Sequence, residues 1–132
     1  MKNCTDLGQS RKLAEFLSFE SADMHYNNVS IKGINYVDEH RAEFMEYNRA
    51  IKVLSKYTVN PLFEVIPCWS LAALFRIIKN CLGYTMQTTY SNNVIIVCEM
   101  GEKPYTITTN EYDNEVDACV EMIVTLHEQN LL

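Results

Sequence analysis

Cysteine is the residue type in this chain best suited to chemistry, either as a zinc ligand or as a nucleophile. Five are present at widely separated positions: Cys4, Cys68, Cys81, Cys98 and Cys119. Zinc sites usually place two cysteines a few residues apart or combine them with a nearby histidine. No Cys-x-x-Cys pair occurs, and no cysteine has a histidine within four residues. The spacing therefore predicts reduced, buried cysteines and a cytoplasmic protein, without a zinc site.

Two further nucleophile candidates adjoin the start of a predicted helix. Ser70 follows Trp69 without the Gly-x-Ser-x-Gly elbow of hydrolases, so a helix-capping hydroxyl accounts for it. Cys68 lies where a helix dipole lowers a thiol pKa, but a nucleophile also needs a basic partner that the sequence does not place.

The Asp-Glu-His segment at 38–40 resembles part of a metal site, although its side chains diverge around a helix. We predict no catalytic, cofactor-binding or metal-ligating residue.

Aromatic side chains suggest binding rather than catalysis. Trp69 is the single tryptophan, and Tyr84 and Tyr105 lie in a segment predicted to form a sheet. These three residues are candidates for an apolar pocket between the tryptophan helix and the sheet, or for a protein interface. A formal net charge of −6 does not provide the basic surface that accompanies base stacking. Nucleic acid is therefore not an expected partner.

Helical periodicity with start signals appears in several segments. Asp6 with Gln9, and Asn114 with Asp117, have the spacing of N-caps. The predicted helices run from Asp6 to about Leu17, from Asp38 to Leu54, from Cys68 or Ser70 to Gly83, and from Asn114 to about Gln129. Arg76 and Lys79 interrupt the longest apolar run, so no membrane span is predicted.

Alternation with a period of two predicts strands in the second half of the chain. The predicted strands are Tyr84–Tyr90, Val94–Met100 and Tyr105–Thr109, which form a three-stranded antiparallel meander. Earlier segments are less regular. Ser18–Asn28 is a predicted loop with Met24 and Tyr26 against the core, and Tyr57–Pro67 is a predicted extended connection. Val29–Tyr36 is predicted to form a short or bulged strand, because Gly33 breaks its register.

These elements predict a single α+β domain over residues 1–132, a length that supports one hydrophobic core. Three or four helices would pack on a small antiparallel sheet, the meander at about 84–109, with a helix at the C-terminus. The sequence leaves open the structure of 28–60, the oligomeric state and the exposure of Cys68.

Several segments resemble a family of small proteins from gut Bacteroidales-type bacteria and their prophages or mobile elements. The segments are Gln9–Glu15 (QSRKLAE) with Ser21–Met24 (SADM), Ile66–Leu74 (IPCWSLAAL) and Asp113–Ile123 (DNEVDACVEMI). Their order and spacing cover most of the chain, but residues 28–60 have no counterpart. Relatives often carry proline where this chain has Glu115, and either residue suits the first turn of a helix. The family has no assigned activity, so the resemblance implies a source and a helix-flanked sheet but no catalytic residues.

Two classes of function follow from these observations. The first is a non-enzymatic accessory protein of a phage or mobile element, acting through protein contacts or as a homodimer, by the sheet face or the tail Asn130–Leu132. The alternative is a small-molecule binder or unrecognised enzyme, with a pocket lined by Trp69, Tyr84 and Tyr105. No cofactor is expected in the first class.

Overall fold

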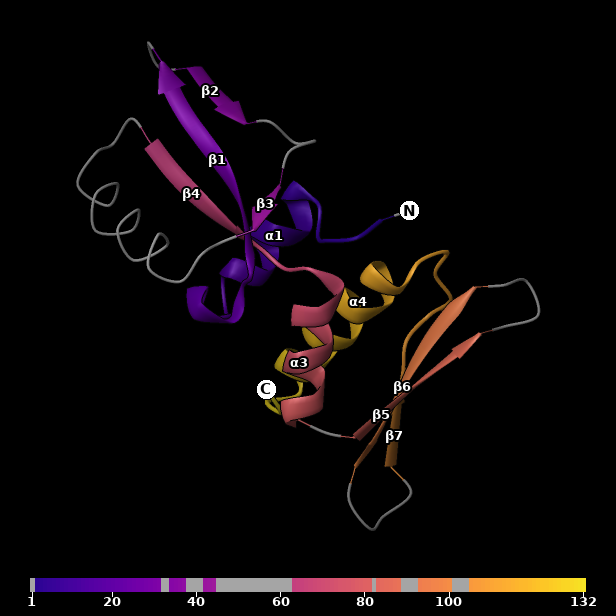
Figure 1. Ribbon diagram of the computed structural model, residues 1–132. Coiled ribbons are helices and arrows are strands. Elements are labelled where there is room, and N and C mark those ends of the chain that lie inside the picture. The colour runs from indigo at the N-terminus through magenta and orange to yellow at the C-terminus, as the bar shows by residue number, and fades with distance from the viewer. Residues whose placement is uncertain are drawn as a thin grey trace. The chain divides into compact units, whose positions relative to one another are not determined.

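The computed structural model describes residues 2–31, 34–37, 42–44, 63–81, 83–88, 93–100 and 105–132. Its elements are α1 (Leu7–Ala14), the 3-10 helix η1 (Phe19–Ser21), β1 (Met24–Ile31), β2 (Ile34–Val37), β3 (Glu43–Phe44), β4 (Phe63–Cys68), α3 (Leu71–Cys81), β5 (Gly83–Thr88), β6 (Val94–Met100), β7 (Tyr105–Thr108) and α4 (Glu115–Glu128) (Figure 1). The predicted α+β class is confirmed. The chain divides into two compact units, one of Asp6–Trp69 and a C-terminal unit of Met1–Thr5 with Ser70–Leu132.

The Asp6–Trp69 unit is built on strand β1. Strand β4 pairs with β1 on one side, from Met24 opposite Cys68 to Val29 opposite Phe63, while β2 and β3 also pair antiparallel with β1. Helix α1 packs on β4 and contributes Leu13, whose side chain is fully buried. The side chains of Met24 and Tyr26 are also buried, as the sequence predicted, but they lie in a strand rather than a loop.

Several predicted boundaries in this unit are wrong. The segment predicted as one strand broken at Gly33 forms two strands, β1 and β2, paired with each other. Positions 43–44 belong to β3 and not to the helix predicted from Asp38, and 63–67 belong to β4 and not to a connection. Within the described residues β4 has only β1 as a neighbour, so Pro67 needs no donor on its outer side. The remainder of the predicted 38–54 helix and of the 57–67 connection, and Gly33 itself, lie outside the described residues.

Helix α1 begins with the predicted capping box. The Asp6 side chain accepts from the Gln9 backbone N–H at 2.8 Å, and the Gln9 side chain accepts from the Asp6 N–H at 3.1 Å. Two of the free N–H groups at the helix start are thereby satisfied. The helix ends at Ala14, before the predicted Leu17, although the Leu17 N–H still donates to the Leu13 carbonyl.

The C-terminal unit combines α3 and α4 with the antiparallel sheet β5-β6-β7 (Figure 1). Helix α4 contacts both α3 and β6, and α3 contacts β5. Alternate residues of β6 are buried with the inner side of α4, which matches the period of two in a strand and the apolar stripe of a helix. Fully buried members of this core include Leu74, Ile78, Ile96, Met122, Ile123 and Leu126.

Helix α3 begins at Leu71, with Ser70 as its cap. The Ser70 hydroxyl accepts from the Ala73 N–H at 3.3 Å, and the Leu71 N–H donates to the Asn3 carbonyl at 3.1 Å. Cys68, the other predicted start, lies in β4. The first residues of the chain therefore supply a hydrogen-bond acceptor to a helix that begins nearly seventy residues later.

Helix α4 ends in a Schellman motif. Asn130 has φ of 56°, the Asn130 N–H donates to the His127 carbonyl at 3.0 Å, and the Leu131 N–H donates to the Leu126 carbonyl at 2.9 Å. This pair of bonds satisfies two carbonyls of the last turn and requires a left-handed residue at Asn130. Asparagine is the non-glycine residue that best tolerates that conformation.

We expect Asn130→Ala to lower the free energy of unfolding by about 1 kcal/mol, because alanine is strained at positive φ. Asn130→Gly should hold stability within about 0.5 kcal/mol, because glycine adopts this conformation freely. Thermal unfolding followed by circular dichroism measures both. The exposed Glu128, two positions earlier, provides a control substitution to alanine. Equal losses for Asn130→Ala and Glu128→Ala would contradict the conformational explanation.

Candidate functional site

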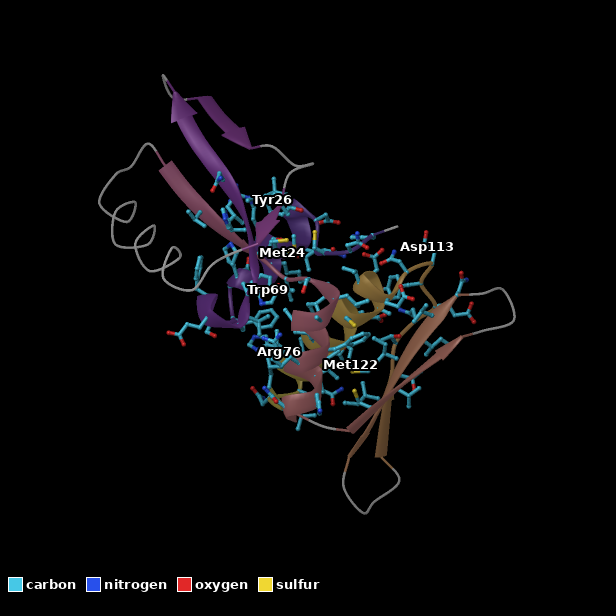
Figure 2. The ribbon with its side chains drawn as sticks, in the orientation of Figure 1. Met24, Tyr26, Trp69, Arg76, Asp113 and Met122 are labelled. Carbon is cyan, nitrogen blue, oxygen red and sulfur yellow. The ribbon has the colours of Figure 1, made fainter. Side chains whose placement is uncertain are left out.

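Trp69, the first predicted pocket residue, is a core residue of the Asp6–Trp69 unit. Its side chain is 0% exposed, and its indole N–H donates to the Ser21 hydroxyl at 2.9 Å. The Ser21 hydroxyl in turn donates to the Ser18 carbonyl at 2.6 Å. Cys68, the residue before Trp69, stands opposite Met24 of β1. Figure 2 labels Met24, Tyr26 and Trp69 of this unit. The polar end of the indole is therefore satisfied inside the fold, as buried tryptophans usually are.

Tyr84 and Tyr105, the other predicted pocket residues, belong to the C-terminal unit. Tyr84 stands opposite Cys98 in the ladder between β5 and β6, and Tyr105 stands opposite Met100 in the ladder between β6 and β7. The two tyrosines thus occupy the two outer strands of one sheet, on either side of β6. The pocket that would combine them with Trp69 stays a prediction.

Three of the cysteine thiols that the structure describes are poorly placed for nucleophilic chemistry. Cys68, Cys98 and Cys119 are each 0% exposed, which confirms the predicted burial at these positions, and Cys4 is half-buried. Burial, followed by the negative charge of Glu115 and the neighbouring Cys98, raises the pKa of Cys119 from 9.0 to about 12. Because the thiolate is the reactive form, Cys119 stays protonated and unreactive at neutral pH.

The described residues carry neither a cluster of metal-binding side chains nor a membrane-spanning helix. Those residues contain no group of three or more histidine, cysteine, aspartate or glutamate side chains placed to hold a metal ion. The candidate segment 38–40 lies outside them. No helix in the same residues is both long and apolar enough to cross a membrane.

A polar network surrounds the start of α4. The Asn114 side chain caps the helix by accepting from the Asp117 N–H at 2.9 Å, as the sequence predicted. The Asp117 carboxylate forms a salt bridge with Lys2 at 2.6 Å, and each side chain is about one quarter exposed. One turn later, the Glu121 carboxylate accepts from the Asn110 backbone N–H and from its side-chain amide, both at 2.9 Å.

The same carboxylates affect Tyr112. Burial raises the pKa of the Tyr112 phenol, and a hydrogen bond with Glu121 and the negative charges of Glu121 and Asp117 act in the same direction. Each influence disfavours the phenolate, so Tyr112 remains a neutral donor to the Glu121 carboxylate. The contacts of Glu121 with Asn110 and Tyr112 hold the segment that follows β7 against α4. We call this group of contacts the clasp.

This clasp lies beyond the end of β7, in the segment that follows Thr108. Val94 pairs with Tyr112, and Ile96 is bonded to Thr109, so Ile95 faces two residues, Asn110 and Glu111, in a β-bulge. Glu121 occupies the Asn110 N–H, as described above, and Glu111 adds an exposed charge. These features hinder strand pairing at Asn110 and Glu111, whereas β7 itself pairs on its outer side with no strand among the described residues.

The other edge strand of the sheet is β5. Its six residues, Gly-Tyr-Thr-Met-Gln-Thr, pair regularly with β6 from Gly83 opposite Glu99 to Thr88 opposite Val94. On the side away from β6, no strand among the described residues pairs with it. Among the described residues β5 and β7 are both edge strands of this sheet, and β5, the longer of the two, is the candidate functional site.

No protein-family model matches this chain, and no curated protein or solved structure matches it either. The functional inference therefore depends on the chain's own residues.

Proposed function

We propose that this chain is a non-enzymatic accessory protein of a phage or mobile element that acts through protein–protein contacts in the cytoplasm. The observation that carries the proposal is the β5 edge, with which no strand among the described residues pairs on the side away from β6. Exposed backbone N–H and C=O groups at a strand edge are a template for pairing with another chain. In this proposal the three-stranded meander, with the helices packed on it, presents the surface that binds the partner protein.

Other observations support the same reading. The unreactive Cys119 thiol and the engaged indole of Trp69 serve the fold rather than a reaction. The net charge of −6 disfavours nucleic acid as a partner. The family resemblance implies the phage or mobile-element setting. The alternative, a small-molecule site that includes Trp69, has less support because a ligand would have to displace buried contacts of the indole.

The proposal is tested with the full-length chain carrying a removable affinity tag. Sedimentation equilibrium and capture from a host-bacterium lysate should detect a complex of defined stoichiometry, formed by the chain itself or with one host or phage protein. Untagged chain should compete with the tagged chain for that complex, and an unrelated acidic protein of similar size should not. A strictly monomeric chain that captures nothing in a saturable manner would contradict the proposal.

A further inference from the structure

The first described residues of the chain, 2–5, are grouped with the C-terminal unit, although the residues that follow them belong to the other unit. The Lys2 ammonium forms a salt bridge with the Asp117 carboxylate at 2.6 Å, and each side chain is about one quarter exposed. Asp117 lies in the first turn of α4, where its second carboxylate oxygen accepts from the Asn114 side-chain amide at 2.8 Å. Lys2 thus ties this segment to the start of α4.

The same segment also contacts the start of α3. The Leu71 N–H donates to the Asn3 carbonyl at 3.1 Å, and Cys4 pairs with Ser70 in an isolated antiparallel bridge. An N–H group in the first turn of a helix has no partner within the helix, so the Asn3 carbonyl satisfies a group that would otherwise need water. The segment therefore connects the starts of two helices, α3 and α4, that the sheet β5-β6-β7 separates in sequence.

These contacts are weaker than those that hold the core of the unit. The pairing of Cys4 is an isolated bridge, whereas β5 and β6 form a ladder of six residue pairs. A partly exposed salt bridge contributes little to stability and weakens as salt is added. The core, by contrast, contains fully buried side chains from α3, β6 and α4, among them Leu74, Ile96 and Ile123. Terminal segments held in this way open at a lower free energy than a packed core.

We propose that residues 2–5 form a latch, a segment that detaches from the starts of α3 and α4 and re-attaches while the core of the unit stays folded. The salt bridge between Lys2 and Asp117 makes the latch sensitive to ionic strength. Thr5, whose side chain is buried, is its fixed end. The structure shows the closed state, and the latch is independent of the proposed function and of the β5 edge.

Opening of the latch has two local signatures. The Leu71 N–H loses its acceptor, so its hydrogen exchange becomes faster. The Cys4 thiol, which is half-buried in the closed state, becomes accessible to alkylation. The Cys119 thiol is fully buried in the core of the same unit, so its alkylation reports unfolding of that core. The three positions therefore separate local opening from loss of the core.

A pair of lysine substitutions in the full chain tests the latch. Lys2→Gln removes the salt bridge, whereas Lys12→Gln makes the same change of charge at an exposed residue in the last turn of α1. Alkylation by iodoacetamide, followed at each cysteine by mass spectrometry, gives the rates for Cys4 and Cys119. Hydrogen exchange followed by nuclear magnetic resonance gives the rate for the Leu71 amide, and circular dichroism melts establish that both variants are folded.

Lys2→Gln should raise the alkylation rate of Cys4 and the exchange rate of the Leu71 amide about 2- to 5-fold, the range for loss of an exposed ion pair. The Cys119 rate should not change, and Lys12→Gln should leave all three rates within about 1.5-fold. Removing a nearby cation by itself slows alkylation, because it disfavours the thiolate, so a faster Cys4 rate reports opening.

Salt provides a second comparison with the same variants. Raising sodium chloride from about 0.02 to about 0.5 M should accelerate alkylation of Cys4 in the unmodified chain, because the salt bridge is screened. The acceleration should be absent in Lys2→Gln, which has no salt bridge to screen.

Two results would overturn the latch. If Cys4 were alkylated only as slowly as Cys119, the segment would open only when the whole unit unfolds. If Lys2→Gln and Lys12→Gln had equal effects on Cys4 and on the Leu71 amide, the salt bridge would not hold the segment in place. Neither result concerns the capture of a partner protein, so failure of the latch is distinguishable from failure of the proposed function.

Discussion

Replacing Trp69 with alanine is expected to lower the free energy of unfolding by about 3 to 5 kcal/mol, the range for deletion of a fully buried large aromatic side chain. The indole is 0% exposed, so the substitution leaves a cavity and removes the hydrogen bond to Ser21. Urea unfolding followed by circular dichroism measures the loss, because the chain has no second tryptophan for fluorescence.

A pair of serine substitutions separates the hydrogen bond from the packing. Ser21→Ala removes the acceptor of the indole N–H and should cost about 1 to 2 kcal/mol, since it leaves a buried donor unsatisfied. Ser18→Ala is the control, because Ser18 contributes its backbone carbonyl to this network, which alanine retains. If Trp69→Ala barely changed the urea midpoint, Trp69 would be exposed in solution and would become a candidate binding residue again.

Raising the pH from 9 to 12 is expected to remove about 4 kcal/mol of stability through Cys119 alone, since each pKa unit corresponds to about 1.4 kcal/mol. The folded state raises the pKa of this thiol from 9.0 to about 12. Below pH 9 the Cys119 thiol is protonated in both the folded and the unfolded chain, so its full contribution to the free energy of unfolding is present. Between pH 9 and 12 the unfolded chain loses the proton and the folded chain keeps it, so unfolding becomes progressively more favourable.

The test compares the slope of unfolding free energy against pH in the unmodified chain and in Cys119→Ala. Between pH 9 and 11 the unmodified chain should lose about 1.4 kcal/mol per pH unit more than the variant, whose titrating thiol is absent. Tyr112, with its raised pKa, acts in the same direction in both proteins and cancels from the difference. Parallel slopes would show that Cys119 is not held protonated by burial.

Local signals in the sequence predicted the elements whose ends are set by nearby residues. Asp6 with Gln9, and Asn114 with Asp117, form the predicted caps, and the predicted strand Val94–Met100 has the bounds of β6. Capping bonds span three residues, and a strand pattern is visible within seven. Such features require no information from distant parts of the chain.

Strand β1 could not be predicted from its own residues. The sequence predicts a loop for Met24–Asn28, more than half of the strand, because Asn27 and Asn28 are residues typical of turns. Pairing with β4 brings Tyr26 opposite Ile66, and both side chains are buried. Strand formation here depends on a partner forty residues away, and such tertiary pairing overrides local preference.

The sequence by itself determined the α+β class, the helix caps and a chain rich in acidic residues but without zinc-ligand spacing. Only the tertiary structure decided which polar groups meet: Lys2 with Asp117, Trp69 with Ser21, and Glu121 with Asn110. It also decided that, among the described residues, β5 and β7 are the edge strands of the sheet β5-β6-β7. The physical reason is that caps and periodicity depend on neighbours within a few residues, whereas edge protection depends on side chains brought together by folding.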